Sequence, residues 1–211
     1  FQGEILLNLD TEDDDELSIG CAGGIDTNTK YTFELEAIHP NSVGLEISIR
    51  GLLGGHSGMD IDKGRGNANK LMNRILYHLV SVVPFQLISI DGGSLRNAIP
   101  RESTAQIAFE KELTNIIHAE IEKIKQTIIL EYATIEKSMQ INIANKSIEN
   151  KAIKHDDLIR LLNTIYSVPN GVFRMSPDIA GLVETSSSLA RVILKEGEFV
   201  TQSLQRSSVE S

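Results

Sequence analysis

The chain has 211 residues, 41% hydrophobic and 23% charged, and is therefore long enough to bury one large core or two small ones. Its net charge of -9 argues against a surface for nucleic acid or anionic membranes, and no apolar run approaches the roughly 20 residues that span a bilayer. We therefore expect neither nucleic acid nor membrane as a partner. The single cysteine, Cys21, excludes an internal disulfide, fits a reducing cytoplasm and is expected to be a small buried apolar residue.

A short apolar run opens the chain, from Glu4 to Asp10, and an acidic cluster follows it up to Glu16. Such a run is typical of a buried parallel strand, whose carboxyl end is where α/β enzymes place site residues. No helix and second parallel strand follow it. We therefore expect the rest of that sheet to lie elsewhere in a longer protein, of which this chain is a piece.

The next hundred residues alternate between strand and helix periodicity. In chain order the pattern predicts a strand at 43–51, a helix from Asn67 to Val82, strands at 85–90 and 103–109, a helix marked by Ile117, Ile121, Ile124 and Ile128, and a strand at 139–144. This βαββαβ order predicts the ferredoxin-like α+β fold, an antiparallel sheet with helices on one face.

A second unit of αβββ order follows and is expected to extend the first. Its helix has Leu158, Leu161, Leu162 and Ile165 on one face, and Asp156 or Asp157 is placed to cap its start. The turn signal VPNG ends this helix. Strands are predicted at 171–176, 181–194 and 198–207, the last two joined as a hairpin across KEGE.

One histidine, His56, lies among glycines in the stretch GLLGGHSGMDIDKGRGNANK. A metal site with Asp60 and Asp62 fits the spacing but lacks a second His or Cys. A phosphate loop in GRGNANK lacks both known glycine spacings, although Asn67 and the helix start could hold an anion or the loop itself. The residues leave a binding or catalytic loop and a tight turn equally open. The other histidines, at 39, 78, 118 and 155, are expected to be surface or structural residues.

Two further polar residues are candidates for binding. Asn97 lies between a Gly-Gly turn and Ile99-Pro100, where its amide could orient a peptide group or simply make an Asx turn. Arg206 alternates in the last strand with Val200, Gln202 and Leu204, so it is expected to project beside core-side residues. Its guanidinium matches a carboxylate, but an arginine in such a strand is more often a solvated charge.

Several blocks together resemble the aminoacyl-histidine (Xaa-His) dipeptidases, also called peptidase D, of the M20 metallopeptidases. They are LLNLDTEDDDELSIGCAGGID, GLLGGHSGMDIDKGRGNANKLMNRIL, GGSLRNAIPRE, RLLNTIYSVPNGV, GLVETSSSLA and QRSSVES, in the order found in that family and covering nearly the whole chain. GGHSG with GNANK and LRNAIPRE is a specific combination.

The resemblance implies a cytoplasmic two-domain enzyme in which a catalytic α/β domain holds two zinc ions and an inserted lid domain closes over a dipeptide. Asp10 in NLDTE matches a metal-ligating aspartate. His56 matches the lid histidine that holds the scissile carbonyl as it becomes an oxyanion. Asn97 and Arg206 match lid positions that grip the substrate, the arginine through the substrate's terminal carboxylate.

This chain matches the lid and only stubs of the catalytic domain. We expect residues 1–25 to be a catalytic stub with a hinge, 26–200 the lid (26–147 and 148–200 being its two units), and 201–211 the last lid strand and the return toward the catalytic domain. The family's other metal ligands and its catalytic Glu-Glu pair have no counterpart. The chain alone is therefore expected to bind no catalytic zinc tightly and to hydrolyse nothing. Asp62 departs from the family's histidine, and its role stays open.

Two alternatives to the Xaa-His dipeptidase lid remain. One is a noncatalytic α+β dimerisation or binding module, which overlaps with the first because M20 lids commonly form homodimers. The other is the lid of a different M20 peptidase or amidohydrolase. The dipeptidase lid and the noncatalytic module differ in whether His56 is needed for catalysis. The lid of another M20 enzyme differs in its substrate.

Overall fold

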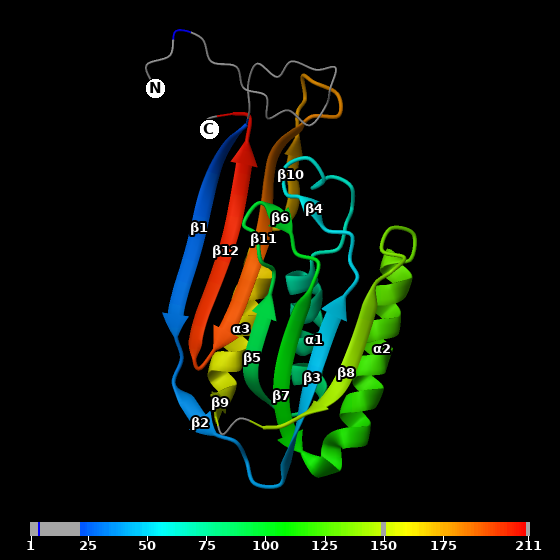
Figure 1. Cartoon of the computed structure of the whole chain (residues 1–211), viewed down its shortest axis with the longest axis vertical. Helices are drawn as coiled ribbons and strands as arrows, with labels where there is room; N and C mark the ends of the chain where they lie inside the picture. Colours follow the sequence, from blue (N-terminus) through cyan, green and yellow to red (C-terminus); the bar gives the residue numbers. More distant parts are fainter. Residues whose placement is uncertain (1–3, 5–21, 149–150, 210–211) are drawn as a thin grey trace.

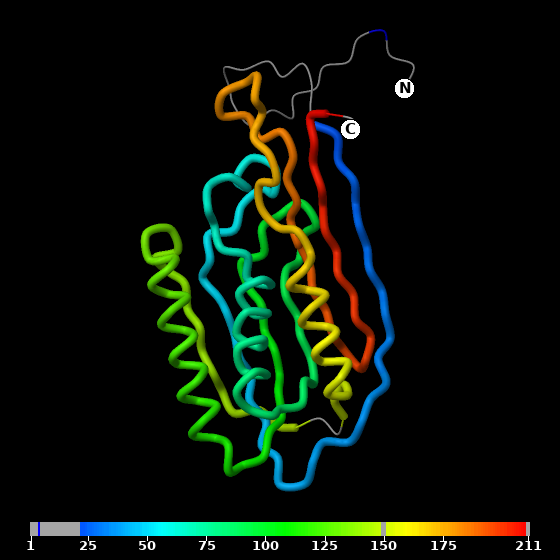
Figure 2. Tube along the Cα trace, turned by 180° about the vertical axis from the view of Figure 1, so that it is seen from behind, coloured from blue at the N-terminus to red at the C-terminus, as the bar shows by residue number. Residues whose placement is uncertain are grey.

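An eight-stranded antiparallel sheet forms the body of the protein in a computed structural model that describes residues 4, 22–148 and 151–209. The strand order along the sheet is β1-β12-β11-β5-β7-β3-β8, and β10 pairs with β11 beside this path. The three α-helices all lie behind the sheet in Figure 1 and in front of it in the reversed view of Figure 2. The sheet therefore has one covered face and one open face.

The elements have the following bounds in chain order. They are β1 (Gly23–Thr32), β2 (Leu35–Ala37), β3 (Ser42–Arg50), β4 (Gly55–His56), α1 (Ala68–Val82), β5 (Gln86–Gly92), β6 (Ala98–Ile99), β7 (Ser103–Glu110), a 3-10 turn at Lys111–Leu113, α2 (Thr114–Tyr132), β8 (Gln140–Lys146), β9 (Lys151–Ile153), α3 (His155–Ser167), β10 (Gly171–Met175), β11 (Val183–Lys195) and β12 (Glu198–Ser207).

The first unit confirms the predicted ferredoxin-like α+β plan. Its strands lie in the order β8-β3-β7-β5, so the second and third of them in sequence are neighbours and the first lies inside. Alternate residues of β3, such as Leu45 and Ile47, are buried in one core with Ile75 and Leu79 of α1. Burying each such side chain contributes about 1.5–3 kcal/mol, so the alternation fixes which face the helices cover.

The second unit has the predicted αβββ order in α3, β10, β11 and β12 and lengthens the same sheet, but the short strand β9, which pairs with β2, precedes its helix unpredicted. The hairpin between β11 and β12 turns at Glu196 and Gly197, both with positive φ, of 51° and 82°. Two consecutive residues in this conformation give the tight turn whose twist matches that of the flanking strands. Strand β12 then runs beside β11 from Lys195↔Glu198 to Thr185↔Ser207.

Strand β1 is a finding that the hydrophobic pattern does not predict. It pairs with β12 along its whole length, from Gly23↔Ser207 to Thr32↔Glu198. All ten of its residues are exposed, because it is an edge strand with no helix behind it. Its polar sequence therefore carries no alternation of apolar residues that periodicity could detect.

The expected cap of the third helix is wrong. Helix α3 begins at His155 with Lys154 at the capping position, and neither Asp156 nor Asp157 caps it. Both aspartates lie inside the first turn, where their negative charges still face the positive end of the helix dipole.

Polar contacts join the two units behind the sheet. The ammonium of Lys70 on α1 donates to the carbonyl oxygens of Ile165 and Tyr166 at 2.7 and 3.0 Å, at the end of α3. Burial lowers the pKa of Lys70, but the three carbonyls it meets, including that of Val168, compensate by accepting its hydrogen bonds. Within the described part of the chain, no helix has the length and apolarity to cross a membrane.

Candidate functional site

A two-stranded ribbon, formed by β4 and β6, brings the glycine-rich stretch onto the open face of the sheet (Figure 1). Gly55 pairs with Ile99 and His56 with Ala98. The N–H of Ser57 then donates to the carbonyl of Asn97 at 2.8 Å. Asn97 itself is exposed in a tight turn, so its side chain is free to face solvent or a ligand. The ribbon therefore places two of the predicted residues beside each other.

The third predicted residue, Arg206, reaches the same place from the other end of the chain. Its Nη2 lies 3.5 Å from Nε2 of His56, across 150 residues of sequence. A Cβ at Gly58 would lie only 3.2 Å from Cδ of Arg206 and Cε1 of His56, so glycine permits this close approach. The structure thus brings together His56, Asn97 and Arg206.

The imidazole of His56 presents a donor toward Arg206. The N–H of Met59 donates to Nδ1 of His56 at 3.2 Å, so in the neutral ring the proton sits on Nε2. A guanidinium has no acceptor, so the two facing groups are both donors. Nε of Arg206 is buried and has no hydrogen-bond partner among the described residues. This arrangement suits a carbonyl or carboxylate oxygen that accepts from both side chains.

The expected orientation of Arg206 is wrong in one respect. It does share a face of β12 with Val200, Gln202 and Leu204, but those positions are only half-buried. The buried positions of β12 are Phe199, Thr201 and Ser203, which point to the helices. Arg206 therefore projects from the open face, and this is why it meets the ribbon rather than the core.

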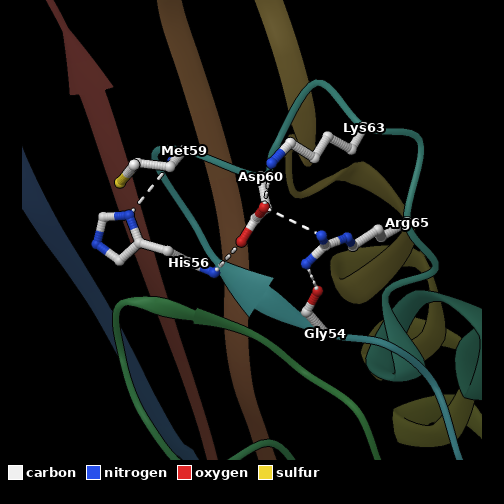
Figure 3. A network of polar contacts seen from close by, with 6 residues as sticks. All are labelled: Gly54, His56, Met59, Asp60, Lys63 and Arg65. Atoms are coloured by element: carbon white, nitrogen blue, oxygen red, sulfur yellow. Dashed lines mark hydrogen bonds and ion pairs between the residues drawn. The ribbon is translucent and has the colours of Figure 1, made fainter. Parts of the chain in front are cut away.

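The sequence suggests Asp60 only as a metal ligand. In the structure its carboxylate instead accepts hydrogen bonds from within the loop (Figure 3). Its Oδ2 accepts the backbone N–H of His56 at 2.8 Å. Its Oδ1 accepts from Lys63 at 2.7 Å and pairs with Arg65 at 3.1 Å. The hydrogen bonds from Lys63 and from the His56 backbone hold the pKa of Asp60 below its ordinary value, with the charge of Arg65 adding to them.

The alternative of a metal site at His56, Asp60 and Asp62 does not match this geometry. Both oxygens of Asp60 already accept from donors of the loop, and Asp62 is exposed. Among the described residues, no three His, Cys, Asp or Glu side chains gather closely enough to hold a metal ion. Asp10, the predicted metal ligand, lies outside the described residues.

Glu136, which follows helix α2, holds the loop that carries His56 at both of its ends. Its side chain is 3% exposed, and its two oxygens accept the N–H groups of Leu53 and Gly66 at 2.7 and 2.8 Å. These two residues flank the loop, so one buried carboxylate holds both of its ends. A buried carboxylate with two N–H donors is stable only while both bonds are made.

Asn67 binds the start of helix α1 and the loop before it, which is one of the two roles that the sequence leaves open. Its Oδ1 accepts from the N–H groups of Asn69 and Lys70, so it is the N-cap of α1. Its amide donates to Oδ1 of Asn170 at 2.7 Å and to the carbonyl of Leu189 at 3.0 Å. Asn67 therefore fastens the loop to the second unit of the sheet.

Comparison with known proteins finds relatives over the whole chain. The M20 family model of the peptidase dimerisation domain matches residues 47–136. The chain is 36% identical to the cytosol non-specific dipeptidase of Escherichia coli, with all of this chain and 44% of that protein aligned. It is similar to the crystal structure of aminoacylhistidine dipeptidase from Vibrio alginolyticus, with a TM-score of 0.90 and 34% identity over 100% of this chain and 43% of that one.

The chain thus spans less than half the length of the relatives that it matches. The similarity nevertheless includes the whole sheet and its helices. Residues 47–136 therefore match the peptidase dimerisation domain of the M20 family, and the whole chain is similar to part of these two dipeptidases.

Proposed function

We propose that this chain is the lid domain of a cytoplasmic, zinc-dependent dipeptidase that hydrolyses Xaa-His dipeptides such as β-alanyl-histidine. The observation that carries the proposal is the convergence of His56 and Arg206, whose donor atoms lie 3.5 Å apart on the open face of the sheet. The names of the two relatives, a dipeptidase and an aminoacylhistidine dipeptidase, support the substrate class. The word cytosol in the first name supports the location.

Each side chain has a role that follows from its chemistry. The Nε2–H of His56 donates to the scissile carbonyl oxygen as negative charge develops on it, so this donor lowers the barrier for hydrolysis. The guanidinium of Arg206 binds the terminal carboxylate of the dipeptide and fixes its orientation for attack. Asn97 orients the peptide group from the adjoining turn.

Zinc does not fit the described residues as a resident ion, because they hold no cluster of three ligand side chains. Within the proposal, the two zinc ions are held by the catalytic domain of the full-length protein, with Asp10 as one ligand. The division into a catalytic stub at 1–25, a lid at 26–200 and a return at 201–211 belongs to the same proposal.

Homodimer formation and contact with the protein's own catalytic domain complete the proposal. The dimer is supported by the match of residues 47–136 to a peptidase dimerisation domain. That match also favours the second candidate function, a noncatalytic dimerisation module. In that case His56 has no part in any reaction.

Replacing His56 by alanine in the full-length protein separates the two functions. The lid function predicts a loss of kcat on the order of 10²–10³ with β-alanyl-histidine as substrate, because a donor to the developing oxyanion is removed. His155→Ala, an exposed histidine at the start of α3, is the matched control and should leave kcat unchanged. Near-normal kcat in His56→Ala would favour the module. Faster hydrolysis of tripeptides or acylated amino acids than of Xaa-His dipeptides would indicate another M20 specificity.

A further inference from the structure

The loop that carries His56 is closed by one carboxylate. Between Gly54 and Arg65 the chain turns around Asp60, whose side chain is 17% exposed. The backbone N–H of Asp60 donates to the carbonyl of His56 at 2.9 Å, and the carboxylate of Asp60 accepts the N–H of His56 at 2.8 Å. Both polar groups of the His56 backbone are therefore held by the same residue.

Arg65 extends this closure to the residue before the ribbon. Its Nη1 donates to the carbonyl of Gly54 at 2.6 Å, while its Nη2 pairs with Oδ1 of Asp60 at 3.1 Å. The planar fork of the guanidinium therefore fixes Gly54 and Asp60 relative to each other, which a lysine could not do with the same geometry. Lys63 also pairs with Asp60, but it is more than half exposed and so contributes less to rigidity.

The sequence leaves room for this contact at one specific position. Gly55 has a φ of 131°, and a Cβ there would lie 2.4 Å from Oδ2 of Asp60 and 2.1 Å from Nη1 of Arg65. Glycine at 55 is therefore required by the packing of the Asp60 and Arg65 side chains against the ribbon.

The closed turn also determines where the imidazole points. It places the N–H of Met59 against Nδ1 of His56, which leaves Nε2 directed at Arg206. A histidine on a half-buried two-residue strand would otherwise sample several side-chain rotamers. From these contacts we propose that Asp60, with Arg65, is a positioning residue that holds His56 in the orientation needed to act with Arg206. The catalytic meaning of that orientation rests on the proposed function, but the orientation itself does not.

Nuclear magnetic resonance on the 211-residue chain tests the orientation without any measurement of activity. The wild-type chain should show a nuclear Overhauser contact between the Hε1 of His56 and the Hδ protons of Arg206. Both carbons lie 3.2 Å from the point that a Cβ at Gly58 would occupy, and Nη2 of Arg206 lies 3.5 Å from Nε2 of His56. Asp60→Ala should abolish this contact. It should also accelerate hydrogen exchange of the His56 amide on the order of tenfold or more, since that amide loses a charged acceptor.

Asp62→Ala is the matched control, because it removes an exposed carboxylate two residues away in the same loop. It should keep the His56–Arg206 contact and the slow exchange of the His56 amide. Persistence of both signals in Asp60→Ala would overturn the proposal. If Asp60→Ala does not fold, Arg65→Lys decides by the same two signals, since it keeps the positive charge but loses the fork. Wild-type signals in that variant would then overturn the proposal.

Kinetics of the full-length protein then separate this inference from the proposed function. If both hold, Asp60→Ala lowers kcat with little change in KM, and Asp62→Ala does neither. A lost His56–Arg206 contact together with unchanged kcat would support the positioning role of Asp60 and would contradict the catalytic role of His56.

Discussion

Two loops at the same end of the sheet are built in opposite ways (Figure 1). The site loop, residues 51–67, is held by the buried carboxylate of Glu136, by Asp60 and by the cap residue Asn67. The β10–β11 loop, residues 176–182, is exposed from 177 onward and closed mainly by the N–H of Ser176 donating to Leu182 at 2.8 Å. Polar anchors that are wholly or partly shielded from solvent are therefore concentrated in the loop that carries His56.

Of the substitutions that test this comparison between the two loops, Glu136→Ala should lower the free energy of unfolding most. It leaves the N–H groups of Leu53 and Gly66 without their acceptor, and we expect the free energy of unfolding to fall by about 3 kcal/mol. Urea denaturation of the chain measures this. Glu131→Ala, which removes an exposed carboxylate in the last turn of α2, should cost less than about 0.5 kcal/mol. Equal losses in the two variants would mean that Glu136 does not anchor the loop.

Acid should weaken the site loop through Asp60. Its pKa is lower in the folded than in the unfolded chain, chiefly through Lys63 and the N–H of His56. Its stabilising contribution is therefore complete above the pKa of an unfolded aspartate, about 3.9, and is lost as the pH falls through the lower folded value. We expect Asp60→Asn to be less stable than wild type at neutral pH, with the difference shrinking below about pH 4. Urea midpoints across this range that stay equally far apart would contradict the assignment.

Ser176→Ala should have the smallest effect. The hydroxyl of Ser176 accepts the N–H groups of Asp178 and Ile179 at 3.3 and 3.1 Å, but both are exposed and water replaces it. We expect a loss below about 0.5 kcal/mol in the same urea experiment. A loss close to that of Glu136→Ala would show that the two loops do not differ in the way described.

Much of this fold could be predicted because its buried residues recur with clear periods. The alternation of Leu45, Ile47 and Ile49 and the helical spacing of Leu71, Ile75 and Leu79 both depend on a face that packs on a core. Strand β1 has no such face. The ribbon of β4 and β6 has only two residues on each side, too few for any period to appear.

The sequence predicts the individual residues of the candidate site, but it does not predict that they lie close together. Resemblance to the family pointed to His56, Asn97 and Arg206, but their proximity depends on how β12 and the ribbon are placed across the sheet. From the sequence, Asp60 is a candidate only for a metal site with His56. An aspartate four residues after a histidine, in a glycine-rich turn, is also typical of a side chain that accepts backbone N–H groups, and that signal could have found its role.

The distance between His56 and Arg206 depends on the junction between the two units of the sheet. Strand β11 pairs with β5 only from Val192 to Leu194, whereas it pairs with β12 along nearly its whole length. His56 belongs to the unit on one side of this short seam and Arg206 to the unit on the other. Substitutions at this seam would therefore change the distance between the two donors without changing either side chain. Within the proposed function, the length of dipeptide that fits between the two side chains would then depend on residues that contact no substrate.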